Sequence, residues 1–475
     1  MPMRPNIIRS ILAETAGLAD KTALVEGTQS ITYGGLAESV ARLAQELNEL
    51  GVRPLDRVAF LCPDSIDYVI LSLAILSLDA AVVPIAPGLM SDERAALPEQ
   101  MDVHFVLSDA ALSPNATGNV LRDTTDLTRT FRLAPRTGVR PPPEGYEAIR
   151  PAFIRFSSGT TGASKGVVLS HETILERTDA ANKGLGVTSG DVVGWVLSMS
   201  FHFVVTILLF LRKGATIVLC GDPLPGALIE ALQRHPLTLL YASPIHYRLL
   251  TASNALEPAQ FASLRMAVST AVKLPAQIAQ SFFERFGVRL TEAYGIIEVG
   301  LPFVHSPHEH ANDGLLGKPL PDYTVKLGAD SEVLIRGKGM FDAYFSPWRP
   351  RAVCQPDGWF HTGDIGEFSE DGGLRLVGRR KAVINFSGMK IFPQEVEEVL
   401  NQFPSVAESL VYGEAHPEYG QLPCAKILLK EGAAPFDEAA LRAFCRSRLA
   451  LHKIPKAFAC VSALPKTASG KIRRI

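Results

Sequence analysis

The chain has 475 residues, and its formal net charge at pH 7 is 47 − 49 = −2. This length exceeds what a single hydrophobic core usually serves, so two or three domains are expected. The balanced charge argues against nucleic acid or an anionic membrane as the main partner.

The six cysteines are scattered, with no C-x-x-C motif and no metal-like spacing to histidine. Reduced thiols in a cytoplasmic protein are the simplest interpretation. The first residues lack the continuous apolar segment of a signal peptide. The apolar run at 203–211 is too short to cross a bilayer. We therefore expect a cytoplasmic protein with no membrane partner.

The first part of the chain predicts alternating helices and strands. Residues 32–51 predict an amphipathic helix, because Leu36, Val40, Leu43 and Leu47 share one stripe and Gly51 suits its C-terminal cap. Strands are then predicted at 57–62, 81–85 and 103–107, with a buried helix at 65–78. This alternation predicts a mainly parallel sheet with helices on both faces. Residues 110–150, rich in Pro, Thr, Arg and Gly, predict loop and connector.

A glycine-rich segment, FSSGTTGASKG at residues 156–166, follows a predicted strand at 152–156 and precedes another at 167–169. Gly159, Gly162 and Gly166 allow main-chain N–H groups to converge on an anion, while hydroxyls and Lys165 add donors and charge. The segment predicts a cradle for a triphosphate. It is not a Walker A loop, whose spacing differs. Taken alone, a flexible surface loop with a solvated lysine is an equal alternative.

The alternation resumes with strands at 216–219, 238–241 and 264–268 and helices at 227–233 and 275–286. From 323 to 377, short strands separated by Gly and Asp turns predict a β-rich subdomain. The predicted fold class is α/β. A large N-terminal domain, residues 1–379, holds mainly parallel sheets and the β-rich subdomain, and residues 380–475 form a small α+β domain.

Five more motifs accompany the loop: YGIIE at 294–298, WFHTGD at 359–364, GRRK at 378–381, INFSG at 384–388 and PKTASGK at 465–471. In this order and spacing, along almost the whole chain, they resemble the adenylate-forming superfamily. That superfamily contains acyl- and aryl-CoA synthetases, peptide-synthetase adenylation domains and beetle luciferases. The resemblance implies that a carboxylate attacks the α-phosphate of ATP, giving an acyl-adenylate and pyrophosphate. A thiol then displaces AMP, and the mobile C-terminal domain swings about a hinge between the two steps.

The resemblance also assigns residues to the nucleotide. The β- and γ-phosphates would be held by Ser158, Thr160, Thr161, Gly162 and Lys165. Tyr294 would flank adenine, with a buried core tyrosine as the alternative, and Glu298 would ligate Mg²⁺ through a hard oxygen.

Further assignments concern the ribose and the C-terminal domain. Asp364 would accept the ribose hydroxyls, with a turn aspartate as the alternative. Arg379 would also touch the ribose and Lys381 would be the hinge, although this run of cations could also be a solvated linker. Gly388 would line the pantetheine tunnel. Lys471 would bridge carboxylate and α-phosphate, its alternative being a disordered terminal lysine.

Three positions depart from the family pattern. Ser164 stands where proline is usual, Ile297 where a threonine contacts the α-phosphate, and Asn385 where lysine is common. The Ile297 change puts the α-phosphate contact in doubt, and the Asn385 change bears on thiolation.

His202 matches the gate beside the acyl pocket, and with Lys471 and Thr161 it completes the predicted catalytic set. No aspartate stands there for an amino group, so an amino acid is a poor substrate candidate. The flanking Phe201 and Phe203 favour an apolar acid, aryl or fatty.

The resulting hypothesis is an ATP- and Mg²⁺-dependent ligase that joins a small carboxylic acid to coenzyme A. One alternative loads the pantetheine of an acyl or peptidyl carrier protein. Alternatives of another class are a phosphoryl-transfer NTPase and a non-catalytic ATP-binding protein. A monomer or a homodimer is expected.

Overall fold

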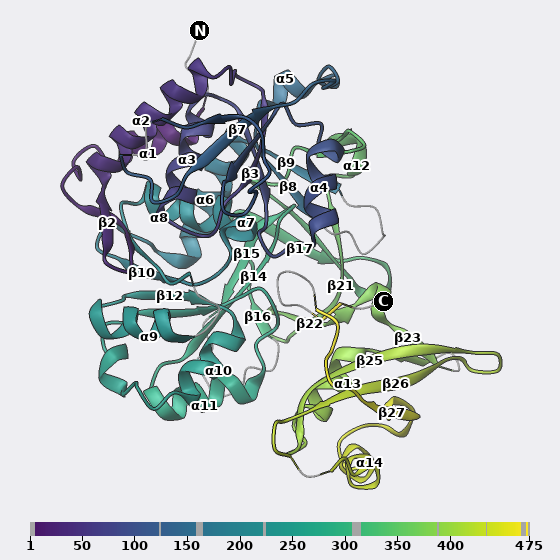
Figure 1. The fold of residues 1–475 in the computed structure, drawn as a ribbon. Coiled ribbons are helices and arrows are strands. Elements are labelled where there is room, and N and C mark those ends of the chain that lie inside the picture. The colour runs from purple at the N-terminus through teal and green to yellow at the C-terminus, as the bar shows by residue number, and fades with distance from the viewer. Residues whose placement is uncertain are drawn as a thin grey trace. The chain divides into compact units, whose positions relative to one another are not determined.

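The structure is a computed structural model, which describes residues 5–122, 125–157, 165–221, 225–305, 315–386, 389–433, 435–466 and 472–473. The chain divides into two compact units (Figure 1). The first comprises Met1–Asn312, Pro319–Thr324 and Arg336–Trp359, and the second Asp313–Lys318, Val325–Ile335 and Phe360–Ile475. The domain boundary expected between residues 379 and 380 stays a prediction.

The first unit contains a nine-stranded sheet in the order β20-β19-β9-β8-β4-β3-β5-β7-β6 among the described residues. Its strands are β20 (Arg349–Pro350), β19 (Ala343–Phe345), β9 (Lys165–Ser170), β8 (Pro151–Ser157), β4 (Ala81–Ile85), β3 (Arg57–Leu61), β5 (Phe105–Asp109), β7 (Phe131–Pro135) and β6 (Asn119–Val120). Strands β8, β4, β3 and β5 are parallel, as predicted, and antiparallel strands flank them.

An eight-stranded sheet, also in the first unit, has the order β15-β14-β13-β12-β10-β11-β1-β2 in the described chain. Its strands are β15 (Gly300–His305), β14 (Leu290–Ile296), β13 (Met266–Ser269), β12 (Leu239–Ala242), β10 (Val192–Trp195), β11 (Thr216–Leu219), β1 (Thr22–Glu26) and β2 (Gln29–Thr32). All pairings are parallel except those at the two edges, β1 with β2 and β14 with β15. The carboxyl ends of its central strands therefore meet at one edge, where ligands bind in open α/β sheets.

Helices cover these sheets: α1 (Ile7–Glu14), α2 (Tyr33–Glu49), α3 (Ile66–Ser77), α4 (Ser91–Gln100), α5 (Tyr146–Ile149), α6 (His171–Leu185), α7 (Met199–His202), α8 (Leu208–Arg212), α9 (Pro225–Arg234), α10 (Pro244–Ala252), α11 (Ala276–Phe286) and α12 (Arg351–Cys354). The predicted helices at 32–51 and 65–78 are confirmed as α2 and α3. Each is capped by a hydroxyl, from Thr32 and Ser65, that accepts a backbone N–H of its first turn.

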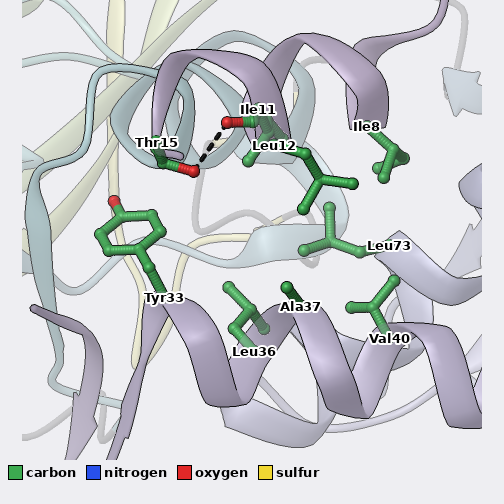
Figure 2. A pocket seen from close by; sticks show the side chains of 9 residues that line it. All are labelled: Ile8, Ile11, Leu12, Thr15, Tyr33, Leu36, Ala37, Val40 and Leu73. Atoms are coloured by element: carbon green, nitrogen blue, oxygen red, sulfur yellow. Dashed lines mark hydrogen bonds between the residues drawn. The ribbon is translucent and has the colours of Figure 1, made fainter. Parts of the chain in front are cut away.

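Helices α1, α2 and α3 line a small apolar pocket, shown in Figure 2. Its lining is aliphatic apart from Tyr33 and Thr15, and the Thr15 hydroxyl already donates to the Ile11 carbonyl at 2.7 Å. No charged side chain is among the described residues that line the pocket. It therefore offers nothing to a triphosphate or a carboxylate, and it is not the candidate site.

The expectation of loop throughout 110–150 was wrong. Strand β7 pairs antiparallel with β5, from Phe105 opposite Pro135 to Asp109 opposite Phe131. Phe131 and Leu133 are buried while their neighbours are more exposed. This alternation marks an edge-side strand, and the surrounding Pro- and Gly-rich segments conceal it in the sequence.

The second unit holds two further sheets. The first has the order β16-β22-β21-β18-β17 in the described chain, with β16 (Leu315–Gly317), β22 (Leu374–Arg379), β21 (Phe360–Phe368), β18 (Glu332–Gly337) and β17 (Tyr323–Leu327). The second has β24 (Met389–Ile391), β23 (Ile384–Phe386), β26 (Gly420–Leu429), β25 (Val406–His416) and, beside β26, β27 (Ala457–Cys460). Figure 1 shows the long β25–β26 hairpin near α13 (Pro393–Leu400) and α14 (Glu438–Arg446). The short strands predicted between residues 323 and 377 and the mixture of helices and strands predicted after residue 380 are both present.

No helix in the described part of the chain is long and apolar enough to span a membrane.

Candidate active site

The glycine-rich segment joins two adjacent antiparallel strands. Phe156 of β8 lies opposite Gly166 of β9, so the segment is held at both ends by the nine-stranded sheet. A Cβ on Gly166 would lie 2.8 Å from the Met101 sulfur and 2.9 Å from an Ile154 methyl, so only glycine fits there without movement. Ser158, Thr160, Thr161 and Gly162 lie outside the described residues. Their assignment to phosphate stays a prediction.

Tyr344 contacts both Lys165, the first residue of β9, and Glu298. The Lys165 ammonium is 5.0 Å from the centroid of the Tyr344 ring. The Tyr344 hydroxyl donates to Glu298 Oε1 at 3.3 Å. Strand β19 carries Tyr344 opposite Val167 of β9, and Glu298 follows β14 in the turn to β15. The sheet pairing thus brings the predicted phosphate lysine and metal carboxylate into one neighbourhood.

Burial, and then the negative charge of Glu298, raise the pKa of Tyr344 far above its usual value. Tyr344 therefore remains a hydrogen-bond donor at physiological pH. Sequence reasoning missed it, because nothing around Tyr344 forms a motif. Among the described residues no cluster of three metal-ligating side chains occurs. A single half-buried carboxylate such as Glu298 suits a magnesium ion held mainly by phosphates and water.

Arg177 of α6 holds the turn that carries Glu298. Its side chain is fully buried; Nη1 donates to the Ile297 carbonyl at 3.0 Å, and Nε and Nη2 donate to the Gly339 carbonyl at 3.0 and 2.6 Å. Gly339 has φ +66°, and a Cβ there would lie 2.6 Å from Arg177 backbone and side-chain atoms. Burial lowers the pKa of Arg177 to about 10, so the guanidinium stays charged at neutral pH. The main chain before Glu298 is thus fixed by a buried cation.

Tyr294, the predicted adenine partner, lies in β14 toward the carboxyl end of that parallel strand. It is half-buried rather than enclosed in the core, and its ring meets Phe303 at 6.0 Å in an edge-to-face arrangement. The alternative of a fully buried core tyrosine is therefore not what the structure shows. Contact with adenine stays a prediction.

His202, the predicted acid gate, ends the short helix α7 among aromatic rings. Its ring centroid is 6.1 Å from that of Trp195, which stacks on Tyr241 at 5.4 Å. Trp195 ends β10 and Tyr241 lies next to the end of β12, so both rings stand at the carboxyl edge of the eight-stranded sheet. The Trp195 indole nitrogen is buried and has no partner among the described residues.

Two charged side chains hydrogen-bond to the backbone of α7. Asp64 Oδ1 accepts the Met199 backbone N–H at 2.9 Å, and Arg155 Nη1 donates to the Phe201 carbonyl at 2.7 Å. Burial raises the pKa of Asp64 to about 7, and the bond from Met199 opposes this only in part. Ser200, also on α7, has a buried hydroxyl. The sequence analysis did not single out Asp64 or Arg155. An arginine inside the apolar run Ala-Phe-Ile-Arg-Phe at 152–156 is nevertheless a visible signal.

In the second unit, the two residues predicted to bind ribose lie side by side. Asp364 of β21 pairs with Arg379 of β22 in the antiparallel register, and Arg379 Nε is 2.6 Å from Asp364 Oδ1. Arg379 Nη1 also donates to the Thr362 carbonyl at 3.3 Å. The Asp364 carboxylate is buried, whereas the Arg379 side chain is about half exposed. The carboxylate is thus already held in place by a cation.

In the predicted hinge region the three consecutive cations, Arg379, Arg380 and Lys381, are exposed. Lys381 lies in the single turn Arg380–Ala382, and Arg380 Nη1 is 3.1 Å from Glu332 Oε2. The Asn385 backbone N–H donates to Gln421 Oε1 at 2.9 Å. Gly388 and Lys471 lie outside the described residues. The roles of hinge, tunnel glycine and bridging lysine stay predictions.

Comparison with known proteins places this geometry in a family. The AMP-binding enzyme model matches residues 13–345, and the AMP-binding enzyme C-terminal domain model matches residues 395–471. A Mycobacterium tuberculosis propanoyl:CoA ligase, whose acid carries a methyl-dioxo-octahydroindenyl group, is 30% identical over 96% of this chain and 95% of its own. A feruloyl-CoA synthase from an Amycolatopsis species is 30% identical over 95% and 94%.

Among solved structures, ATP-bound MatB from Rhodopseudomonas palustris superposes with a TM-score of 0.84 at 21% identity, over 99% of this chain and 97% of its own. That likeness concerns the fold. Together with the family matches and the relatives, it confirms the predicted fold class and the resemblance drawn from the motifs. The chain belongs to the AMP-binding enzyme family of the adenylate-forming superfamily, and it is an AMP-forming acid–thiol ligase of the acyl- and aryl-CoA synthetase type.

Proposed function

We propose that this enzyme activates an apolar carboxylic acid, aryl or fatty, with MgATP and transfers the acyl group to coenzyme A. The observation that carries the choice of acid is the aromatic wall beside His202. Trp195 and Tyr241 are stacked and buried, and Phe201 flanks the histidine. Aromatic faces bind apolar acyl groups well.

The names of the relatives agree with this class, since one acts on ferulate and another is a long-chain fatty acid ligase. We propose Glu298 as the Mg²⁺ ligand, Tyr294 as the adenine partner, and Asp364 with Arg379 for the ribose. Lys165 and the neighbouring loop would bind the outer phosphates. Coenzyme A is preferred to a carrier protein because the relatives are CoA ligases.

A pyrophosphate-release screen over aromatic and fatty acids tests the proposal. We expect release of AMP and pyrophosphate that depends on one class of acid, and a thioester when coenzyme A is added. Release of ADP and phosphate would indicate the NTPase alternative instead. If a thioester forms only with a holo-carrier protein, the proposal of coenzyme A as the acceptor is wrong, whereas the proposed activation of the acid is supported.

A further inference from the structure

Arg155 is a half-buried cation beside the predicted acid gate. It lies in β8, just before the glycine-rich segment, and its Nη1 donates to the Phe201 carbonyl at 2.7 Å. Its guanidinium carbon is 5.2 Å from the centroid of the Phe201 ring. Phe201 directly precedes His202, so Arg155 joins the strand that leads into the phosphate loop to the segment that carries the gate.

The protein does not complete the hydrogen bonding of this guanidinium. Arg155 Nε is buried and has no partner among the described residues, and no carboxylate of that part of the chain forms an ion pair with Arg155 within 4 Å. A charge that is largely removed from water and has no counterion is destabilising, and an unsatisfied buried donor calls for an explanation. Arg155 as a whole residue is only half-buried, so it is not enclosed in the core.

The charges around Arg155 include the carboxylate that is predicted to bind the metal. Burial lowers the pKa of Arg155 to about 10, the Glu298 carboxylate opposes this shift, and Arg177 adds to it. By its hydrogen bond and its ring contact, Arg155 touches Phe201, the residue next to the predicted acid gate. At neutral pH Arg155 is a cation whose Nε–H has no partner among the described residues.

We propose that the Arg155 guanidinium binds the carboxylate of the acid substrate and holds it beside His202 for attack on ATP. This rests on the proposed function. In the step concerned, a carboxylate oxygen forms a bond to the α-phosphorus, and the bond from that phosphorus to the bridging oxygen of pyrophosphate breaks. The electron pair leaves with pyrophosphate, and no proton is transferred. The guanidinium offsets the repulsion between the carboxylate and the phosphates, in a chain where Ile297 contributes no hydroxyl.

The test uses ATP–pyrophosphate exchange by the full-length enzyme with benzoate or octanoate, whichever acid supports exchange. We expect Arg155→Met to raise the half-saturating acid concentration at least about tenfold while changing that of MgATP less than about threefold, because a charge-assisted bond to the acid alone is lost. Arg155→Lys, which keeps the charge without the fork, should fall between wild type and Arg155→Met.

A second readout separates binding from mere packing. Inhibition of exchange by the primary amide of the same acid should be unchanged in Arg155→Met, because the neutral amide does not need the cation. The matched control is Arg57→Met, since Arg57 is a more deeply buried arginine that likewise donates to a backbone carbonyl, that of Asp102 at 2.6 and 2.8 Å. It should lower the melting temperature without changing the half-saturating acid concentration.

The outcomes are distinguishable. No exchange by the wild-type enzyme with any acid would refute the proposed function. Exchange by the wild type with an unchanged acid requirement in Arg155→Met, or an effect on MgATP alone, would overturn only the role of Arg155. If Arg155→Met does not fold, Arg155→Lys decides: an acid half-saturation equal to that of wild type overturns the proposal.

Discussion

Arg379 Nε lies 2.6 Å from Asp364 Oδ1, across two neighbouring strands of one sheet. The family pattern assigns both residues to the ribose. The contact between them lets the cation hold the buried carboxylate in one orientation without a nucleotide. A ribose hydroxyl would then meet a preorganised acceptor.

Asp364→Asn should weaken ATP binding. The amide keeps the shape but loses the charge that Arg379 and a ribose diol would share, so we expect KM for ATP to rise at least about tenfold. Steady-state kinetics with varied MgATP measure this. Glu367→Gln is the matched control, since Glu367 pairs with Arg375 at 3.6 Å on the same two strands but is exposed. An exposed pair contributes little, so KM for ATP should stay within about twofold of the wild-type value. An unaltered KM in Asp364→Asn would contradict the ribose assignment.

Tyr344→Phe should weaken the response to magnesium. The change removes the hydroxyl that donates to Glu298 Oε1 and leaves the ring over Lys165 in place. A hydrogen bond to a charged group is worth roughly 1.5 kcal/mol, so we expect the half-saturating Mg²⁺ concentration to rise about tenfold at fixed ATP. Tyr412→Phe, in β25 of the second unit, is the control and should give the wild-type Mg²⁺ curve. A Mg²⁺ titration identical to wild type in Tyr344→Phe would exclude this role.

Much of the fold could be predicted because its elements have strong local signals. The stripe of Leu36, Val40 and Leu43 and the Thr32 cap define α2 without reference to the rest of the chain. The motifs likewise predicted Asp364 and Arg379, which the register of β21 and β22 brings together. The sequence alone is therefore sufficient to predict those elements whose periodicity and capping residues lie within the element itself.

The residues that were missed act through contacts distant in sequence. Tyr344 reaches Glu298 across 46 positions, and Arg177 reaches Ile297 across 120. Strand pairing and helix packing create these contacts, and no spacing in the sequence encodes them. Arg155 differs from these residues. A charged side chain within an apolar strand destabilises the fold unless it has a partner, and the arginine can be seen in the apolar run of the sequence itself.

Lys471→Ala should separate the two half-reactions. By its resemblance to the family motif, Lys471 is expected to stabilise the negative charge that develops at the α-phosphate. This residue lies outside the described part of the chain. Loss of such a cation lowers the rate roughly 10²–10³-fold, so ATP–pyrophosphate exchange should fall by that factor. Thioester formation from a supplied acyl-adenylate and coenzyme A should stay near the wild-type rate. Arg473→Ala removes a cation two positions further along the chain and should leave both rates unchanged. Exchange that survives in Lys471→Ala would show that adenylation does not depend on this lysine.

Asp64→Asn should stabilise the protein at alkaline pH. Burial raises the pKa of Asp64 to about 7, from an ordinary value of 3.8. Between these values the folded state keeps a proton that the unfolded state releases, so the Asp64 contribution becomes increasingly unfavourable as pH rises from about 4 to 7. Asparagine cannot ionise, and its oxygen can still accept the Met199 N–H that Asp64 accepts at 2.9 Å.

Thermal unfolding between pH 4 and 8 measures the effect. We expect the melting temperature of Asp64→Asn to exceed that of wild type by about 2 °C or more at pH 8, because each kcal/mol shifts the transition of a large domain by a few degrees. The difference should shrink steadily toward pH 4, where the wild-type carboxyl is protonated in the folded state. Asp92→Asn, an exposed position in the first turn of α4, should show no such pH dependence. A melting temperature below wild type at pH 8 would mean that the carboxylate charge stabilises α7 and that burial is not the dominant influence on Asp64.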